Sequence, residues 1–193
     1  MKKSTQFSGY LFLALVFPFM VNAGDSVPPV QADDLPPGRS ADLATLRSYW
    51  HKTRIDHFET ATTMGQNAAL TVFGYVEVRA EARVLKSAQA QTVALDLYWN
   101  EELQDNATVA TSESVQMLLA AGYEKKATEG FIYQEPFKGT VPLYLFYSEE
   151  LKDFRTSTLA PKDPALRQAN YVLVRIEGYV FPVTATVPAY SDT

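Results

Sequence analysis

The stretch VALDLYWNEEL at residues 93–103 aligns with VPLYLFYSEEL at residues 141–151 when the chain is shifted by 48 residues. Extending this shift without gaps divides the chain into three units, 45–92, 93–140 and 141–188. A fixed period over three units is typical of repeat proteins, in which no unit buries its apolar face alone. Four positions are identical in all three units: Thr60, Thr108 and Thr156; Leu70, Leu118 and Leu166; Tyr75, Tyr123 and Tyr171; and Glu81, Glu129 and Glu177.

Each unit is predicted to contain two strands, a short helix and two further strands. Residues 141–147 are rich in β-branched and aromatic side chains, which favours a strand. A helix is expected from about Ser112, and Asp163 before Pro164 predicts a capped helix start in the third unit. The helices are expected to end at one shared position, where the left-handed backbone conformation favours glycine or asparagine. The residues at that position are Gly74, Gly122 and Asn170.

The residues near the end of each unit indicate how the three units can close into a ring. Glu-Ala or Glu-Gly at 81–82, 129–130 and 177–178 interrupts the strand that follows the helix, which indicates a bulge or a tight turn. The predicted fold class is β-rich with short helices, in which the three 48-residue repeats close into a pseudo-threefold, trefoil-like ring. A three-bladed miniature propeller is the alternative, and both arrangements avoid exposed sheet edges.

Composition excludes several classes of function. The chain has 193 residues, no cysteine, only two histidines and a net charge of −5, with a pI of about 5.1. Disulfides, thiolate metal sites and cysteine nucleophiles are therefore excluded. An acidic chain also lacks the basic surface that nucleic-acid binding requires. We expect no metal and no cofactor.

The first residues predict export from the cytoplasm. Lys2 and Lys3 precede an uncharged apolar stretch at 10–21, and the small residue Ala23 fits a signal-peptidase site. The stretch is shorter than the roughly 20 residues of a membrane span, so we expect no integral membrane segment after cleavage. The predicted organisation is a signal peptide (1–23), a flexible linker (24–44), the three-repeat domain (45–188) and a tail (189–193), in a periplasmic or secreted protein.

Four short segments resemble a known family: Val141-Pro142-Leu143-Tyr144, Asp56-His57-Phe58-Glu59-Thr60, Gly122-Tyr123 and Glu129-Gly130-Phe131. They are similar to a bacterial secreted three-repeat domain of unknown function whose signature is His-Phe-Tyr-Thr-Thr, then Gly-Trp or Gly-Tyr, then Glu-Gly. Similar domains are often appended to secreted hydrolases, so the resemblance implies an accessory binding role. This chain departs from the signature because only His57 keeps the histidine, whereas the 48-residue shift places Asp105 and Asp153 at that position.

The first unit is the predicted site of partner binding, because it alone gathers basic side chains on an acidic protein. The candidate residues are His51, Lys52, Arg54, His57 and Glu59. The repeated threonines and glutamates are interpreted as structural, with each carboxylate accepting main-chain N–H groups at the adjacent turn. No catalytic residue is expected.

The aromatic side chains allow two interpretations. Trp50, Trp99, Tyr98, Tyr144 and Tyr147 could stack on sugars or anchor a protein, although core packing is the favoured use for most of them. The sequence therefore predicts an exported, monomeric, non-catalytic binding module for a protein or an envelope component. A glycan-binding, lectin-like accessory domain is the alternative, and a hydrolase is the weaker one.

Overall fold

The computed structural model describes residues 43–183, and the predicted signal peptide, most of the linker and the tail lie outside this range. The order strand, strand, helix, strand occurs three times along the chain. We call these groups of elements the first, second and third unit. The first holds β1 (Leu43–His51), β2 (Asp56–Thr60), α1 (Thr63–Thr71) and β3 (Val76–Leu85). The second holds β4 (Thr92–Asn100), β5 (Asp105–Val109), α2 (Ser112–Ala120) and β6 (Glu124–Tyr133). The third holds β7 (Val141–Ser148), β8 (Asp153–Ser157), α3 (Pro164–Gln168) and β9 (Val172–Val180).

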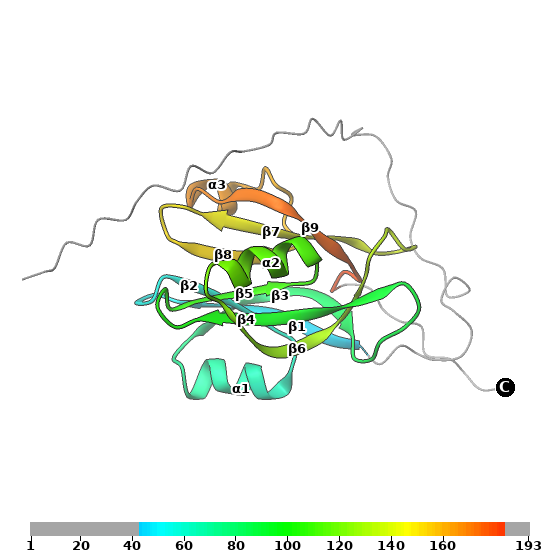
Figure 1. Cartoon of the computed structure of the whole chain (residues 1–193), viewed down its shortest axis with the longest axis horizontal. Helices are drawn as coiled ribbons and strands as arrows, with labels where there is room; N and C mark the ends of the chain where they lie inside the picture. Colours follow the sequence, from blue (N-terminus) through cyan, green and yellow to red (C-terminus); the bar gives the residue numbers. More distant parts are fainter. Residues whose placement is uncertain (1–42, 184–193) are drawn as a thin grey trace, which may run out of the picture.

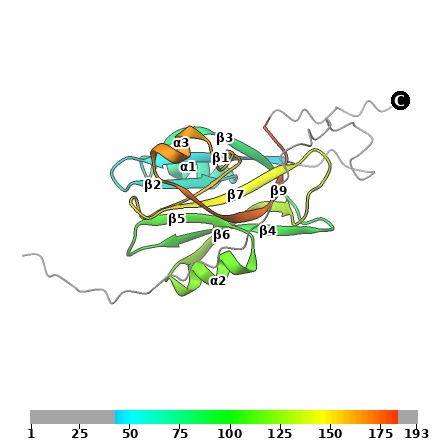
Figure 2. The ribbon, with the colours of Figure 1, turned by 90° about the horizontal axis from the view of Figure 1, so that it is seen from above.

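The protein is β-rich, and the nine strands between residues 43 and 183 belong to one antiparallel sheet (Figure 1). In every unit the first strand pairs with the second and also with the long third strand. The helices lie on the outside of the strands: α1 is below them in the first view (Figure 1), and α2 is below them in the second (Figure 2). No helix between residues 43 and 183 has the length and apolar character needed to cross a bilayer.

The last strand of each unit is continuous, so the prediction of two strands after the helix is wrong. In the first unit Leu46 pairs with Ala82 and Arg47 with Ala80, which leaves Glu81 as the extra residue of a β-bulge. The same shift in register occurs at Glu129 and at Glu177. Of the two predicted interruptions, the bulge is the one that the structure contains. A bulge bends a strand without ending it, and this explains why a turn-like pair of residues sits inside a strand.

Single residue pairs connect the three units. Leu85 in β3 pairs with Phe131 in β6, and Tyr133 in β6 pairs with Tyr179 in β9. Phe181, just after β9, exchanges two main-chain hydrogen bonds with Arg83 in β3, at 2.8 and 3.2 Å. The backbones approach closely at these junctions. At Gly178 a Cβ atom would lie 2.6 Å from the carbonyl oxygen of Tyr133, which only glycine permits.

The helix ends follow the sequence signals. The side chains of Thr62, Thr111 and Asp163 accept main-chain N–H groups at the first turns of the three helices, and Pro164 occupies the first turn of α3. The predicted stop residues all have positive φ: Gly74 at 74°, Gly122 at 84° and Asn170 at 53°. These local signals are reliable because capping depends on residues close in sequence.

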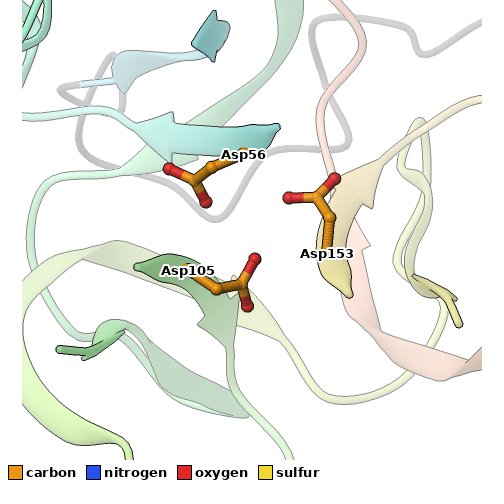
Figure 3. Close-up of side chains that lie close together, drawn as sticks. All are labelled: Asp56, Asp105 and Asp153. Atoms are coloured by element: carbon orange, nitrogen blue, oxygen red, sulfur yellow. The ribbon is translucent and has the colours of Figure 1, made fainter. Parts of the chain in front are cut away.

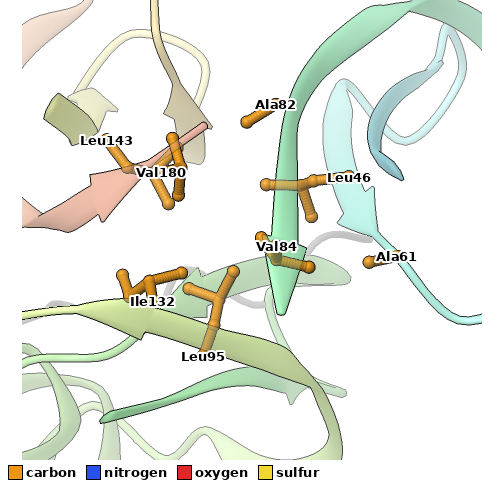
Figure 4. Close-up of a cluster of buried hydrophobic side chains, with 8 residues drawn as sticks. All are labelled: Leu46, Ala61, Ala82, Val84, Leu95, Ile132, Leu143 and Val180. Atoms are coloured by element: carbon orange, nitrogen blue, oxygen red, sulfur yellow. The ribbon is translucent and has the colours of Figure 1, made fainter. Parts of the chain in front are cut away.

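The central core draws on all three units (Figure 4). Leu46, Leu95 and Leu143, one from the first strand of each unit, are fully buried. Burying one such side chain contributes about 1.5–3 kcal/mol, so this layer couples the units. Their neighbours in the cluster are Ala61, Ala82, Val84, Ile132 and Val180.

The gap-free 48-residue register is wrong in the first unit. Asp56 begins β2 as Asp105 begins β5, which is a spacing of 49 residues, whereas Asp105 and Asp153 are 48 apart. Gly74 and Gly122 are again 48 residues apart, so the first unit contains one extra residue between Asp56 and Gly74, near the end of α1. As a result Ala69, not Leu70, takes the buried position that Leu118 and Leu166 occupy, and Leu70 is 49% exposed.

Candidate functional site

Three buried aspartates meet where the second strands of the units begin (Figure 3). Carboxylate oxygens of Asp56, Asp105 and Asp153 all lie within 4.8 Å of one another. Each aspartate also accepts a main-chain N–H from the following unit: Asn106 donates to Asp56 at 2.8 Å, Phe154 to Asp105 at 3.3 Å and His57 to Asp153 at 2.7 Å. We call this group the aspartate cluster.

A tyrosine hydroxyl donates to each member of the cluster. Tyr75 donates to Asp56, Tyr123 to Asp105 and Tyr171 to Asp153. The side chain of Asn106 donates to Asp56 at 2.9 Å, and Nδ1 of His57 lies 2.8 Å from Asp153. Every carboxylate oxygen of the cluster therefore already accepts at least one hydrogen bond.

Burial controls the protonation of the cluster. It raises the pKa of Asp56 to about 6 and the pKa of Asp105 well above its usual range. Burial also lowers the pKa of His57, although Asp153 beside it opposes this change. Carboxylate oxygens are ligands for hard cations. Here, however, they act as acceptors for donors from all three units, so we assign the cluster a structural role.

A pocket of about 380 Å³ lies between the hairpin β1–β2 and the hairpin β4–β5. This volume is within the range of roughly 300–1,000 Å³ that small-molecule sites occupy. Aromatic and charged side chains line it together, which distinguishes it from the core. The lining residues are Arg54, Phe58, Phe73, Tyr75, Leu97, Trp99, Glu101, Gln104, Asn106 and Lys126.

Arg54 is the central charged group of this pocket. Its guanidinium carbon lies 5.9 Å from the ring centre of Phe73, 6.0 Å from that of Tyr75 and 5.8 Å from that of Trp99. No carboxylate of residues 43–183 lies within 4.0 Å of the Arg54 guanidinium. The hairpin turn holds the residue in place, because its main-chain N–H donates to Nδ1 of His51 at 3.0 Å.

The other polar groups that line the pocket form hydrogen bonds or ion pairs. The indole N–H of Trp99 donates to Glu101 at 2.8 Å, and the side-chain amide of Gln104 donates to the same carboxylate at 3.2 Å. Lys126 forms an ion pair with Glu124 at 2.7 Å. Of these contacts, the hydrogen bond to Glu101 restrains the Trp99 ring.

The five residues predicted to bind a partner lie in two different environments, the surface and the interior. Arg54 lines the pocket, His51 packs edge-on against Tyr75 with ring centres 5.0 Å apart, and Lys52 is exposed on the turn. His57 and Glu59 are buried, with 8% and 1% of their surface exposed, so neither can form a surface contact. All five residues of β2 are buried, so a basic residue type in this strand does not indicate an exposed charge.

Glu59 belongs to an internal network. Its carboxylate accepts the hydroxyl of Ser48 at 2.8 Å and the main-chain N–H of Thr156 at 3.2 Å. Burial raises the pKa of Glu59 well above its usual range, against the lowering effect of Arg155. The residue therefore connects the first unit to the third instead of facing solvent.

The repeated glutamates make long-range contacts across the units. Glu129 accepts main-chain N–H groups of Ala61 at 2.7 Å and Thr62 at 3.0 Å, just before α1. Glu177 accepts those of Ala110 and Thr111, both at 2.8 Å, just before α2. Glu81 likewise contacts the loop before α3, where it accepts the main-chain N–H of Thr158 at 3.2 Å. The acceptor role was expected, but the donors belong to another unit and not to the adjacent turn.

The repeated threonines are all fully buried. Thr60 donates its hydroxyl to Glu129 at 2.7 Å. Thr108 donates to the carbonyl of Glu59 at 2.8 Å, and Thr156 to the carbonyl of Thr108 at 2.6 Å. Thr60 therefore occupies a different environment from the other two, as the corrected register requires.

At each of the other two junctions a ring of one unit packs on a ring of the next. Phe154 of the third unit packs edge-on against Tyr123 of the second, with ring centres 6.0 Å apart. His57 of the first unit packs edge-on against Tyr171 of the third at 5.8 Å. In the corrected register Leu103 and Leu151 take the place of Arg54. The combination of an arginine and an aromatic wall thus occurs at one junction of the three.

Sequence reasoning missed most of this pocket. Phe73, Gln104 and Lys126 carried no signal as isolated residues, and Trp99 was one of several aromatics assigned mainly to the core. The pocket forms only when two hairpins about 50 residues apart come together. A pattern analysis of one unit at a time cannot find such a site.

Comparison with known proteins is consistent with an uncharacterised domain. No curated protein and no solved structure gives a significant match. Residues 44–181 match the model of a family described as a domain of unknown function (DUF5648), and this range covers β1 to the residue after β9. The chain therefore belongs to the DUF5648 family.

Proposed function

We propose that this chain is an exported, non-catalytic binding module for a protein or an envelope component, and that it holds one ligand in the pocket beside Arg54. The observation that carries this proposal is the pocket itself. It combines a guanidinium without a carboxylate partner among residues 43–183 with a wall of aromatic rings. Its occurrence at one junction supports one ligand per chain.

The burial of the titratable groups supports a binding function rather than a hydrolytic one. The aspartate cluster and His57 are buried, and the carboxylates accept hydrogen bonds from tyrosine hydroxyls, main-chain N–H groups and the side chains of Asn106 and His57. A general base needs to reach its substrate within about 3 Å, or through one water molecule. Asp56, Asp105 and Glu59, whose pKa values burial raises, instead accept hydrogen bonds from another unit.

The contacts between units also support a trefoil-like closure with pseudo-threefold symmetry. The second strands β2, β5 and β8 contact one another in all three combinations. The pairs Leu85–Phe131, Tyr133–Tyr179 and Arg83–Phe181 join the third strands in a cyclic order. A propeller would instead give each unit a separate blade, whereas here all nine strands share one sheet.

Tryptophan fluorescence provides a direct test. The chain has two tryptophans, so a Trp50→Phe variant leaves Trp99 as the only one and makes the emission a signal from the pocket. This variant is titrated with soluble oligosaccharides and peptides, and the stoichiometry is measured by calorimetry. We expect a change in Trp99 emission and one ligand per chain.

Variants at matched positions identify the site. Trp99→Ala and Phe73→Ala are expected to abolish binding, whereas Tyr147→Ala, at the position in the third unit that corresponds to Trp99, is expected to retain it. Circular dichroism and thermal melting confirm that each variant is folded. Binding that persists in both folded pocket variants, or three equivalent sites per chain, would refute the proposed site.

A further inference from the structure

We infer that the pocket binds a sugar ring that carries a carboxylate, such as a hexuronate residue of an acidic glycan. This inference rests on the proposed function and specifies its ligand. Three observations lead to it: the state of Arg54, the rings around it and the polar groups opposite.

Arg54 supplies the charge that would recognise the ligand. Its guanidinium lies against the rings of Phe73, Tyr75 and Trp99, and no carboxylate of the described chain neutralises it. A planar guanidinium presents several N–H donors in a geometry that matches a carboxylate bidentately. The aromatic contacts reduce its freedom to move, so less entropy is lost when a carboxylate binds.

The position of Arg54 also excludes cationic ligands. Aromatic rings in this arrangement attract cations. In this protein the guanidinium of Arg54 already occupies that position, and a second cation would be repelled by it. A ligand with a negative group is therefore the complementary one.

The aromatic wall favours a ring-shaped ligand. Phe58, Phe73, Tyr75 and Trp99 come from two hairpins and contribute to the same pocket. The face of an aromatic ring is negative, so it attracts the polarised C–H groups on the apolar face of a sugar. A volume of about 380 Å³ suits a compact ligand better than an extended peptide.

The remaining lining groups can contact hydroxyls. Glu101 accepts hydrogen bonds from Trp99 and Gln104, and Gln104 also lines the pocket, whereas the side-chain amide of Asn106 already donates to Asp56 and Tyr75. Carboxylate and amide groups provide both the acceptors and the donors that sugar hydroxyls need. Glu101 also repels an anionic ligand. Replacing this carboxylate with a neutral side chain therefore tests whether the ligand is negatively charged.

The experiment compares acidic sugars with their neutral counterparts. The Trp50→Phe protein is titrated with galacturonate and glucuronate oligosaccharides and, separately, with galactose and glucose oligosaccharides of the same length. We expect the acidic sugars to bind roughly tenfold to a hundredfold more tightly, as one charged hydrogen-bonded pair provides. Arg54→Gln is expected to remove this difference.

Two further variants separate the pocket charge from the overall charge. Lys52→Gln lies on the same turn and changes the net charge equally, but Lys52 does not line the pocket, so affinity is expected to change less than about twofold. Glu101→Gln keeps an oxygen acceptor for Trp99 and removes the repulsion, so the acidic sugars are expected to bind more tightly. The neutral sugars carry no charge, so Glu101→Gln is expected not to make them bind more tightly.

The possible outcomes distinguish the inference from the function on which it rests. Equal binding of acidic and neutral sugars, unaffected by Arg54→Gln, would refute the acidic ligand and retain the pocket as a binding site. A response of Trp99 to carboxylate-bearing peptides but to no sugar would also refute the inference and retain the site. Partner binding that leaves the Trp99 emission unchanged and survives Trp99→Ala would refute the proposed function itself.

Discussion

Asp153 accepts the main-chain N–H of His57 at 2.7 Å across 96 residues of sequence, so the beginning of β8 is joined directly to the beginning of β2. The same carboxylate accepts the hydroxyl of Tyr171 and lies 2.8 Å from Nδ1 of His57. One fully buried side chain therefore satisfies donors from the first and third units.

Replacing Asp153 is expected to destabilise the whole domain. Asp153→Ala leaves at least two buried donors without an acceptor, at about 1–3 kcal/mol each, so the free energy of unfolding should fall by roughly 2–6 kcal/mol. Asp153→Asn keeps one acceptor oxygen and is expected to cost less. Urea denaturation measures both variants, and a change below about 0.5 kcal/mol for Asp153→Ala would show that these bonds contribute little.

Stability is expected to depend on pH through Asp56. Burial raises the pKa of Asp56 to about 6, above the ordinary value of 3.8, so the folded state binds a proton more tightly than the unfolded state. The stabilisation from this group is complete below the unfolded pKa and is lost as the pH rises from 3.8 to about 6. His57 has the opposite effect. Burial lowers its pKa, so the unfolded state binds the proton more tightly, and stability from this group is lost as the pH falls below the ordinary value of 6.5.

The contribution of Asp56 is separated by substitution. Asp56→Asn does not titrate, so the difference in the free energy of unfolding between wild type and variant should shift with pH by up to about 1.4 kcal/mol per unit in this window. The wild type is expected to lose stability relative to the variant as the pH rises. Thermal melts at intervals between pH 3.5 and 7 measure the difference, and a difference that is independent of pH would contradict the assignment.

Glu129 is expected to stabilise the start of α1. Its carboxylate accepts two main-chain N–H groups and one hydroxyl from residues 60–62. Glu129→Ala should therefore cost about 2–5 kcal/mol, since it leaves several buried donors without an acceptor. Glu124→Gln, an exposed change in the same strand, is the control and should stay within about 0.5 kcal/mol. Hydrogen exchange in α1 is expected to rise in Glu129→Ala ahead of exchange in α3.

The leucines of the helices provide a test of the corrected register. Leu118 is fully buried, and Leu118→Ala should cost about 2–5 kcal/mol. Leu70 shared its position in the gap-free register but is 49% exposed, so Leu70→Ala should cost well under half as much. Chemical denaturation of both variants measures the comparison. Equal losses would restore the 48-residue spacing in the first unit.

The sequence was most informative where structure depends on neighbouring residues. The start of α2 at Ser112, the cap at Asp163 and the positive φ values of Gly74 and Gly122 all follow from short-range preferences. The bulge at Glu129 was one of two interruptions considered, because Glu-Gly suits either. Within one unit, residue types are strong evidence for backbone conformation.

The sequence was least informative where units meet. Hydrophobic periodicity does not show a single extra residue, so His57 was aligned with Asp105 in place of Asp56. The partner of Glu129 is a loop almost 70 residues earlier in the chain, and no local pattern identifies it. The pocket beside Arg54 has the same origin, since its two walls are brought together by packing alone.

The junction between Arg83 and Phe181 has a consequence for how the domain can be connected to other chains. Leu43 begins β1 and packs into the same small cluster as Phe181, which follows β9. The beginning of the first described strand and the end of the last one therefore lie side by side. A short linker between these two positions would therefore allow circular permutation, with new termini in the loop between β3 and β4. For the same reason the domain could be inserted into a surface loop of another protein without stretching either chain.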